Sequence, residues 1–379
     1  MAKKQKKKNS MKTLVKIIIT LAILLALCVV AVTGVTALKK HTLDQKIADV
    51  EAANKKKEEA WLIAKAEYEN ATRSGENLSW PAAKTEGWDV VDLTTFPVEN
   101  ATRVTMDRQS LLTGGLMLIN QWHAIPADFS DAALSSVRGA TNSRVPVRDN
   151  NVKLFPVASE ALDMLVMDAN LQGLEDYIVQ NAYRTNEEQT NLWNKVVERL
   201  SKRFDGETLT NQAKKEVNYP GTSDYQSGFS FDMKLYKKGD TAVTNADFED
   251  TPQGQYFNEN CWKYGIIFRF PARDFPSASW EDKSYKTGVS SQLNLYRYVG
   301  KAHAAAMRVL DMCLEEYIEF LIAHPHICIY ENDALAYEIV RIKGVGDQQS
   351  ISLPVPNPAS GYQASLDNMD GVVMAYSYR

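Results

Sequence analysis

Residues 220–232 read Pro-Gly-Thr-Ser-Asp-Tyr-Gln-Ser-Gly-Phe-Ser-Phe-Asp, and they lie between stretches with clear secondary-structure signals. Before them, Tyr177–Val179 is typical of a short buried strand, and Thr185 and Glu188 have the spacing of a capping box ahead of a helix. After them, residues 265–268 again have the composition of a strand. Helices and short strands are mixed without a regular βαβ repeat, so the sequence predicts an α+β fold.

The C-terminal third of the chain predicts helices first and strands afterwards. Helical patterns run from about 301 to 312 and from about 314 to 323, and they complete a globular domain that we place at residues 106–325. Residues 326–379 contain four strand-like segments and no further helical pattern. We therefore predict that they form a small, separate β-rich extension.

The N-terminus has the pattern of a membrane anchor. Residues 1–16 form a basic tail with seven lysines and no acidic residue, and residues 17–38 carry no charge. As a helix, the uncharged stretch would span about 33 Å, close to the roughly 30 Å of a hydrocarbon core. The excess of lysine before it predicts a single-pass cell-membrane protein with a cytoplasmic N-terminus and an extracytoplasmic C-terminal domain. The alternative is a cleaved signal peptide, for which Val35-Thr36-Ala37 would supply the cleavage site.

Residues 39–105 are predicted to form a helical stalk and a linker. Residues 41–68 are rich in alanine, glutamate and lysine and lack proline and glycine, which is typical of a helix. Glycine and proline recur from 69 to 105, where we expect a linker with lead-in strands. The apolar residues of the stalk follow a 3–4 spacing, so a short coiled coil that dimerises the protein is an alternative to a simple stalk.

The charge distribution excludes one class of partner. The formal net charge is −4, and because the basic tail contributes seven positive charges, the rest of the chain carries −11. That part of the chain has no basic patch of the kind that binds nucleic acid, so we predict no nucleic-acid partner.

Four segments carry a family resemblance. Residues 183–189 read Tyr-Arg-Thr-Asn-Glu-Glu-Gln, residues 264–271 read Tyr-Gly-Ile-Ile-Phe-Arg-Phe-Pro, and Arg-Tyr-Val-Gly at 297–300 precedes the two C-terminal helices. Together with residues 220–232, they resemble the bacterial VanY-type D-alanyl-D-alanine carboxypeptidases, zinc enzymes that trim peptidoglycan stem peptides. The resemblance covers about residues 150–322. It implies a metallopeptidase fold with a small antiparallel sheet flanked by helices.

The residues that the resemblance implies for zinc and catalysis are mostly replaced. In the family, two histidines and an aspartate bind zinc and a glutamate acts as the base. The matching positions here are Tyr225 and Leu295 for the histidines, Asp232 for the aspartate and Gln292 for the glutamate. A catalytic zinc needs three protein ligands, and an amide cannot take a proton from metal-bound water. With only Asp232 retained, the sequence predicts no bound cofactor, no catalytic residue and no metal ligand set.

Histidines elsewhere offer little replacement for the lost ligands. His123 precedes the matched region, and His303 lies on the helix after Gly300, where a packing role is the simpler interpretation.

The residues that the resemblance implies for substrate binding are retained more completely than those for zinc binding. It implies that Arg184, Gln189 and Ser223 contribute to substrate binding, with the Arg184 guanidinium gripping the terminal carboxylate of a stem peptide. Structural roles are the alternative: Arg184 could pair with Glu188, and Ser223 could be needed only for the loop to fold.

Three functions follow from these observations. The leading hypothesis is a catalytically inactive, membrane-anchored pseudoenzyme that binds stem peptides or scaffolds cell-wall remodelling. The second is an active zinc D-alanyl-D-alanine carboxypeptidase whose ligands come from elsewhere in the chain. The third is a purely structural protein in which Tyr225 and Leu295 close the old cleft.

Overall fold

The computed structural model describes residues 85–98, 101–277, 280–289, 292–332, 334–356 and 359–378, together with Thr20 and Gln45. The basic tail, the predicted anchor at 17–38 and the predicted stalk at 41–68 lie outside the described residues, apart from those two positions. None of the helices in the described part is long and apolar enough to cross a membrane.

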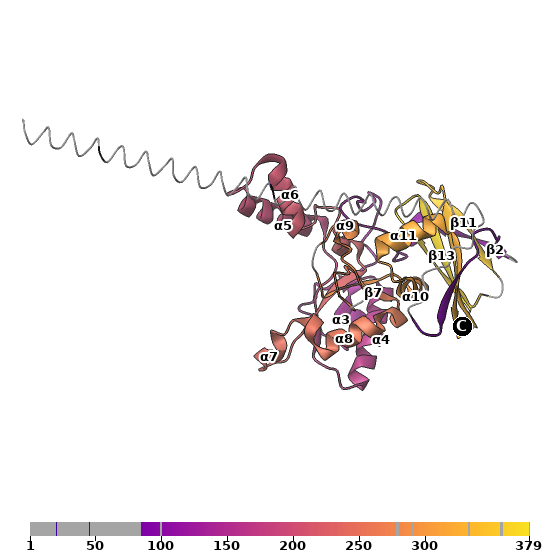
Figure 1. Ribbon diagram of the computed structural model, residues 1–379, viewed down its shortest axis with the longest axis horizontal. Helices are drawn as coiled ribbons and strands as arrows, with labels where there is room; N and C mark the ends of the chain where they lie inside the picture. The colour runs from indigo at the N-terminus through magenta and orange to yellow at the C-terminus, as the bar shows by residue number, and fades with distance from the viewer. Residues whose placement is uncertain are drawn as a thin grey trace, which may run out of the picture.

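A four-stranded antiparallel sheet forms the centre of the domain that carries the family segments (Figure 1). Its order is β5 (Tyr177–Asn181), β6 (Ser230–Leu235), β8 (Leu295–Tyr298) and β7 (Ile266–Phe268). The strands predicted at 177–179 and 265–268 are thereby confirmed. Helices α4 (Pro156–Leu171) and α8 (Pro252–Asn260) share one hydrophobic core with this sheet.

The alternation of side chains in β6 and β8 separates this core from the candidate site. Phe231 and Tyr296 belong to the core shared with α4 and α8. Because successive side chains of a strand point to opposite faces, Asp232 and Leu295 point to the other face. These two residues are direct partners in the β6–β8 register. The predicted metal positions therefore meet on the face of the sheet away from the main core.

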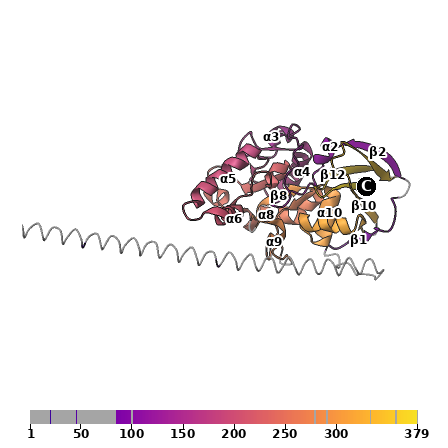
Figure 2. The ribbon, with the colours of Figure 1, turned by 90° about the horizontal axis from the view of Figure 1, so that it is seen from above.

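Helices α5 (Asn186–Leu200) and α6 (Gly206–Glu216) form a hairpin at the end of the molecule opposite the C-terminal strands (Figures 1 and 2). The predicted capping box begins α5: the Glu188 N–H donates to Thr185 Oγ1 over 3.1 Å, and the Thr185 N–H donates to the Glu188 carboxylate over 2.8 Å. Trp193 and Ala213 help to form a small separate core between the two helices.

The β-rich part consists of a five-stranded sheet and a two-stranded sheet. The five-stranded order is β1 (Trp88–Asp92), β9 (His326–Glu331), β10 (Ala334–Lys343), β13 (Gly371–Ser377) and β12 (Gly361–Leu366). The two-stranded sheet pairs β2 (Ala101–Asp107) with β11 (Ser350–Pro356).

This β-rich part differs from the separate C-terminal extension that the sequence predicted. Strands β1 and β2, which fall in the stretch assigned to the linker, pair with β9 and β11. Helices α10 (Lys301–Leu310) and α11 (Leu314–Ala323) share a core with β9, β10 and β13. Residues 326–379 are therefore joined to the preceding domain by packing. The sequence did not reveal this arrangement, because strand pairing and helix packing bring together segments that lie far apart in the chain and share no local pattern.

The remaining elements are short. They are α2 (Arg108–Leu112), β3 (Ser135–Ser136), α3 (Val137–Ala140), β4 (Lys153–Leu154), η1 (Asp224–Ser227), α7 (Thr241–Thr244), η2 (Phe248–Asp250), η3 (Cys261–Tyr264) and α9 (Ser284–Thr287).

Candidate functional site

Asp232 lies at the centre of the candidate site and is only 7% exposed. Its carboxylate accepts hydrogen bonds from the Asn181 backbone N–H over 2.6 Å and from the Asn181 side-chain amide over 2.8 Å. The Tyr225 hydroxyl donates a third bond over 2.8 Å. Burial raises the pKa of Asp232, although the bonds from Asn181 and Tyr225 act in the opposite direction. The carboxylate is thus held by the protein's own donors.

Tyr225, which the sequence comparison placed at the first family histidine, is a hydrogen-bonding group in the structure. It lies on η1, and its hydroxyl accepts a bond of 2.6 Å from the Gln292 amide while donating to Asp232. Burial, followed by the negative charge of Asp232, raises the pKa of Tyr225 well above its usual value. The phenol therefore keeps its proton and stays neutral at physiological pH. A tyrosine that binds a metal ion does so as the charged phenolate.

The loop that presents Tyr225 explains part of the quoted segment. Gly228, which ends η1, has φ +75°, and a Cβ added there would lie 2.7 Å from the Phe155 ring. Only glycine satisfies both conditions without strain. Ser223 begins the same turn and is 1% exposed. The Gln226 side chain closes the turn by accepting bonds from the backbone N–H groups of Gly221 and Ser223.

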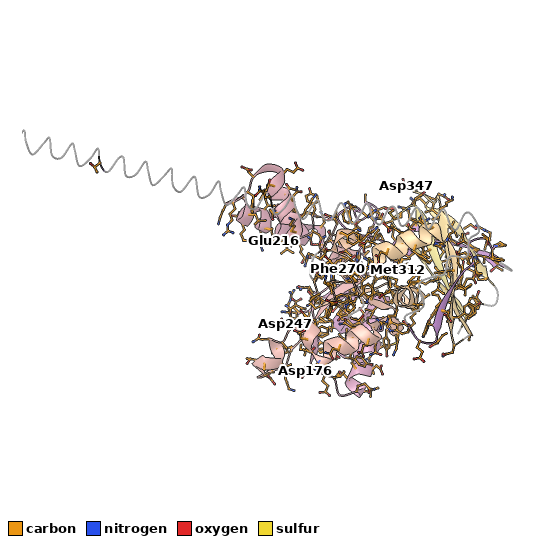
Figure 3. All side chains as sticks on the ribbon, in the orientation of Figure 1. Asp176, Glu216, Asp247, Phe270, Met312 and Asp347 are labelled. Atoms are coloured by element: carbon orange, nitrogen blue, oxygen red, sulfur yellow. The ribbon has the colours of Figure 1, made fainter. Side chains whose placement is uncertain are left out.

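Apolar side chains surround the Tyr225 ring. Tyr225, Phe270 and Leu295 form one buried cluster, with Val289 packed against it. Figure 3 labels Phe270 in the middle of the molecule, between the helical hairpin and the C-terminal strands. Leu295 is fully buried directly beside Asp232 in the sheet. Leu295, predicted to stand at the second family histidine, therefore contributes packing and no lone pair.

These residues do not fit a zinc ion. The retained carboxylate is engaged by Asn181 and Tyr225, the phenol keeps its proton, and Leu295 has no donor atom. Within the described ranges, no group of three or more histidine, cysteine, aspartate or glutamate side chains is placed to hold a metal ion.

The histidines considered as replacements make other contacts. A ring nitrogen of His123 lies 2.9 Å from the Asn120 side-chain oxygen. His303 is fully buried with Nδ1 2.9 Å from the Tyr317 hydroxyl, and burial lowers the pKa of His303 to about 3. The contacts of His303 are those of a packing residue, as the sequence indicated.

Arg184 lies beside this group with its guanidinium over the Tyr225 ring, 4.4 Å from the ring centre. Its Nη1 donates to the Gln189 side-chain oxygen over 2.8 Å. Gln189 is fully buried, and its amide donates to the Asn218 carbonyl over 2.6 Å. The alternative pairing of Arg184 with Glu188 is not what the structure has, because Glu188 caps α5. Gln189 thus orients Arg184.

Arg184 also lines a polar pocket of about 410 Å³. Asn181 forms part of the same wall, so the pocket begins next to the Asp232 carboxylate. Arg148 and Lys195 add two further basic side chains to the lining. The structure thus brings Arg184 to an accessible cavity, whereas Ser223 and Gln189 are buried beside it.

A buried ionic network next to the site was not predicted as such. Arg269 and Glu315 form a two-pronged pair with distances of 2.9 and 2.8 Å, and Arg297 Nη1 lies 2.5 Å from Asp224. Arg269 Nε lies 3.2 Å from the same aspartate. Burial alone would raise the pKa of Asp224, but the charges of Arg269 and Arg297 hold it below its usual value.

The network joins segments that are far apart in the sequence, where the residues could be recognised only as members of separate motifs. Asp224 lies on η1, Arg297 on β8 and Glu315 on α11, and Arg297 also donates to the Gly115 and Met117 carbonyls over 3.0 and 2.6 Å. The sequence signal for this network was the presence of Arg269 and Arg297 in two of the family segments. Its pairing with acidic residues far along the chain required the tertiary structure.

Comparison with known proteins agrees with this architecture. The family model of the VanY D-alanyl-D-alanine carboxypeptidases matches residues 151–301. A D-alanyl-D-alanine carboxypeptidase of Enterococcus faecium is 27% identical over 278 residues, which are 73% of this chain and 79% of the relative. The bifunctional D-Ala-D-Ala dipeptidase and carboxypeptidase of Enterococcus gallinarum is 31% identical over 176 residues, which are 46% of this chain and 83% of the relative.

A solved structure has the same fold. The vancomycin-resistance D,D-dipeptidase VanXYg, in complex with a D-Ala-D-Ala phosphinate analogue, matches with a TM-score of 0.57 at 22% identity, covering 73% of this chain and 99% of that one. The fold is thus the one that this solved structure has. The chain belongs to the VanY family of D-alanyl-D-alanine carboxypeptidases.

Proposed function

We propose that this chain is a non-catalytic member of its family that binds the C-terminal end of peptidoglycan stem peptides. The observation that carries the proposal is the hydrogen bond from the Tyr225 hydroxyl to Asp232, at the place where relatives are expected to hold zinc. It leaves the retained carboxylate occupied and puts a neutral phenol where a ligand is needed.

The proposal excludes catalysis for a second reason. Peptide hydrolysis by a metal-bound water needs a group that accepts the water's proton. Gln292 stands in the position of that base, and its amide is already donating to Tyr225 over 2.6 Å. An amide does not titrate near neutral pH, so the site would lack a base even with a metal ion bound.

Binding is supported by the state of Arg184. Its guanidinium is oriented by Gln189 and by the Tyr225 ring, and among the described residues its other nitrogens form no hydrogen bond or ion pair. The same side chain lines the 410 Å³ pocket. Such a pre-oriented planar fork suits a peptide carboxylate, because little side-chain entropy remains to be lost on binding. With Arg148 and Lys195, the basic side chains of the lining outnumber its acidic residue, Glu188, which favours an anionic chain end further.

We also propose that the domain faces the cell wall from the outer side of the membrane. This part rests on the sequence pattern of residues 1–38, a basic tail followed by 22 uncharged residues. Protease treatment of intact cells that digests the domain while sparing an N-terminal tag would support this orientation, and complete protection of the domain would contradict it.

The experiment that tests the binding proposal uses the full-length chain, zinc analysis and a peptide ending in D-Ala-D-Ala. We expect less than one zinc per chain after dialysis, no release of D-alanine, and saturable peptide binding that Arg184→Ala abolishes. Arg199→Ala is the matched control, because Arg199 is an exposed arginine on α5 paired with Glu216. One tightly held zinc per chain, or equal peptide affinity in the Arg184 variant, would overturn the proposal.

A further inference from the structure

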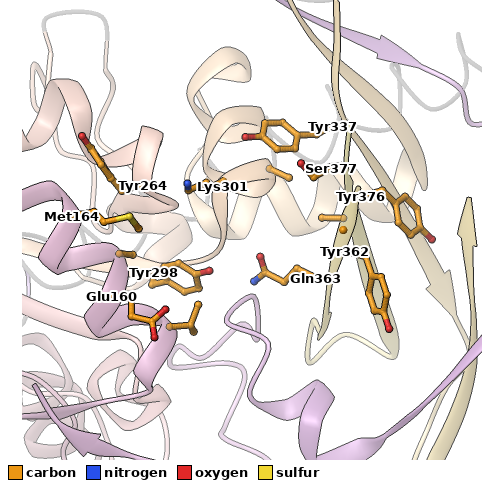
Figure 4. Close-up of a pocket in the computed structure, with 15 residues that line it drawn as sticks. Glu160, Met164, Tyr264, Tyr298, Lys301, Tyr337, Tyr362, Gln363, Tyr376 and Ser377 are labelled. Carbon is orange, nitrogen blue, oxygen red and sulfur yellow. The ribbon is translucent and has the colours of Figure 1, made fainter. Parts of the chain in front are cut away.

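A second pocket lies where the peptidase-like domain meets the β-rich part, and no role in peptide binding accounts for it. It measures about 560 Å³, within the size range of small-molecule sites. One wall comes from α4 and from the start of α10, and the other from β10, β12 and β13 (Figure 4). Tyr298, Lys301, Tyr337 and Gln363 approach the space between these walls.

Tyr298 is the most informative of these residues. It is 7% exposed, and its hydroxyl has no hydrogen-bond partner among the described residues. Burial, followed by the charge of Glu160, raises the pKa of Tyr298 to about 12, so the hydroxyl is a permanent donor at neutral pH. The hydroxyl is not among the solvent-excluded polar atoms, so it opens into the pocket, and a ligand that covers it must supply an acceptor or leave the hydroxyl unsatisfied.

The other side chains are of two kinds. Tyr337 is half-buried on β10, directly opposite Ser377 of β13, and adds an aromatic ring with a polar tip. Lys301 and Glu160 are exposed, line the same pocket and form no ion pair with each other. The pocket thus combines aromatic rings with a positively charged donor, Lys301, and a negatively charged acceptor, Glu160.

This combination narrows the ligand chemistry. A purely apolar ligand would leave the Tyr298 hydroxyl unsatisfied, and a small anion would meet the carboxylate of Glu160 as well as the ammonium of Lys301. A sugar has C–H faces that pack on tyrosine rings, and its edges carry groups that both donate and accept hydrogen bonds. The pocket matches that pattern.

We propose that this pocket binds an oligosaccharide of N-acetylated amino sugars. The pocket itself indicates a sugar. The choice of N-acetylated sugars rests on the proposed function, because stem peptides are attached to glycan strands of that kind. The protein would then contact the cell wall at two places, through the peptide at Arg184 and through the glycan at the junction of its two parts.

The test is calorimetric titration of the full-length chain with β-1,4-linked tri-N-acetylglucosamine. We expect saturable binding, weakened roughly three- to tenfold by Tyr298→Phe, which removes only the hydroxyl and keeps the packed ring. Tyr337→Ala is expected to weaken binding at least as much. Tyr236→Ala is the control, because Tyr236 is 53% exposed and is not part of the pocket lining.

The outcomes separate this proposal from the peptide-binding proposal. Arg184→Ala is expected to leave oligosaccharide binding unchanged, and Tyr298→Phe to leave peptide binding unchanged. Absence of saturable binding, or binding that neither tyrosine variant alters, would overturn the glycan site. Binding of inorganic phosphate or acetate that depends on Lys301 and not on the tyrosines would identify an anion site instead, and would equally overturn it.

Discussion

The hydroxyl of Tyr225 lies 2.8 Å from a carboxylate oxygen of Asp232. This contact joins η1, which carries Tyr225, to β6, which carries Asp232. In a metal site, the same two positions would share an ion. Here Tyr225 donates a hydrogen bond to Asp232, and Leu295 packs beside Tyr225.

Restoring the family residues should restore the metal. The triple variant Tyr225→His, Gln292→Glu and Leu295→His is expected to bind about one zinc per chain, because Tyr225 and Leu295 already adjoin Asp232 in the fold. Zinc content after dialysis is the measurement. The variant Tyr225→His alone is the control and should bind zinc far more weakly. A folded triple variant that holds no zinc would show that these positions do not converge as described.

Asp232 should make stability depend on pH. Its pKa is raised in the folded protein above its ordinary value of 3.8. The folded state therefore favours the protonated form, and this contribution is fully present below pH 3.8 and lost as the pH rises through the folded-state pKa. We expect the free energy of unfolding of the native chain to fall across that window relative to Asp232→Asn, which cannot ionise.

Tyr225→Phe provides a second check on the same contact. It removes one donor to the carboxylate, so the pKa of Asp232 should rise further and the window should move to higher pH. Denaturant unfolding at a series of pH values measures both effects. Identical pH profiles for the native chain and Tyr225→Phe would mean that the pKa of Asp232 does not depend on Tyr225.

The buried ionic network should be far more important for stability than surface pairs. Asp224→Ala leaves Arg269 and Arg297 buried without their shared carboxylate, and we expect a loss of about 3–5 kcal/mol in the free energy of unfolding. Glu216→Ala removes the exposed pair with Arg199 and should cost about 1 kcal/mol or less. Equal effects of the two changes in denaturant unfolding would contradict the structural role of Asp224.

Gln189 should affect peptide binding without touching the peptide. Gln189→Ala removes the acceptor that orients Arg184, so affinity for a D-Ala-D-Ala peptide should fall roughly three- to tenfold. Gln253→Ala is the matched control, since Gln253 is only half-buried, lies outside the pocket lining and its amide likewise donates to a backbone carbonyl. Unchanged affinity in Gln189→Ala, measured by calorimetry, would mean that Arg184 keeps its orientation through Tyr225 alone.

The local elements of the peptidase-like domain could be predicted well. The capping box at Thr185 and Glu188, the strand at 265–268 and the helix at 314–323 are in the structure, because each depends on residues a few positions apart. The β-rich part was predicted less well. Strand β1 pairs with β9 across more than two hundred residues, and no local periodicity reveals such a pairing.

The sequence by itself indicated the family and predicted that its zinc ligands are replaced, because both depend on which residue types stand at ordered positions. Only the tertiary structure decided what surrounds Asp232: a neutral phenol hydrogen-bonded to its carboxylate, with an arginine over the phenol ring. It also decided that the β-rich part packs against α10 and α11 and forms a pocket with α4. Hydrogen bonds and cavities arise between side chains from distant segments, and their geometry is fixed only when those segments pack together.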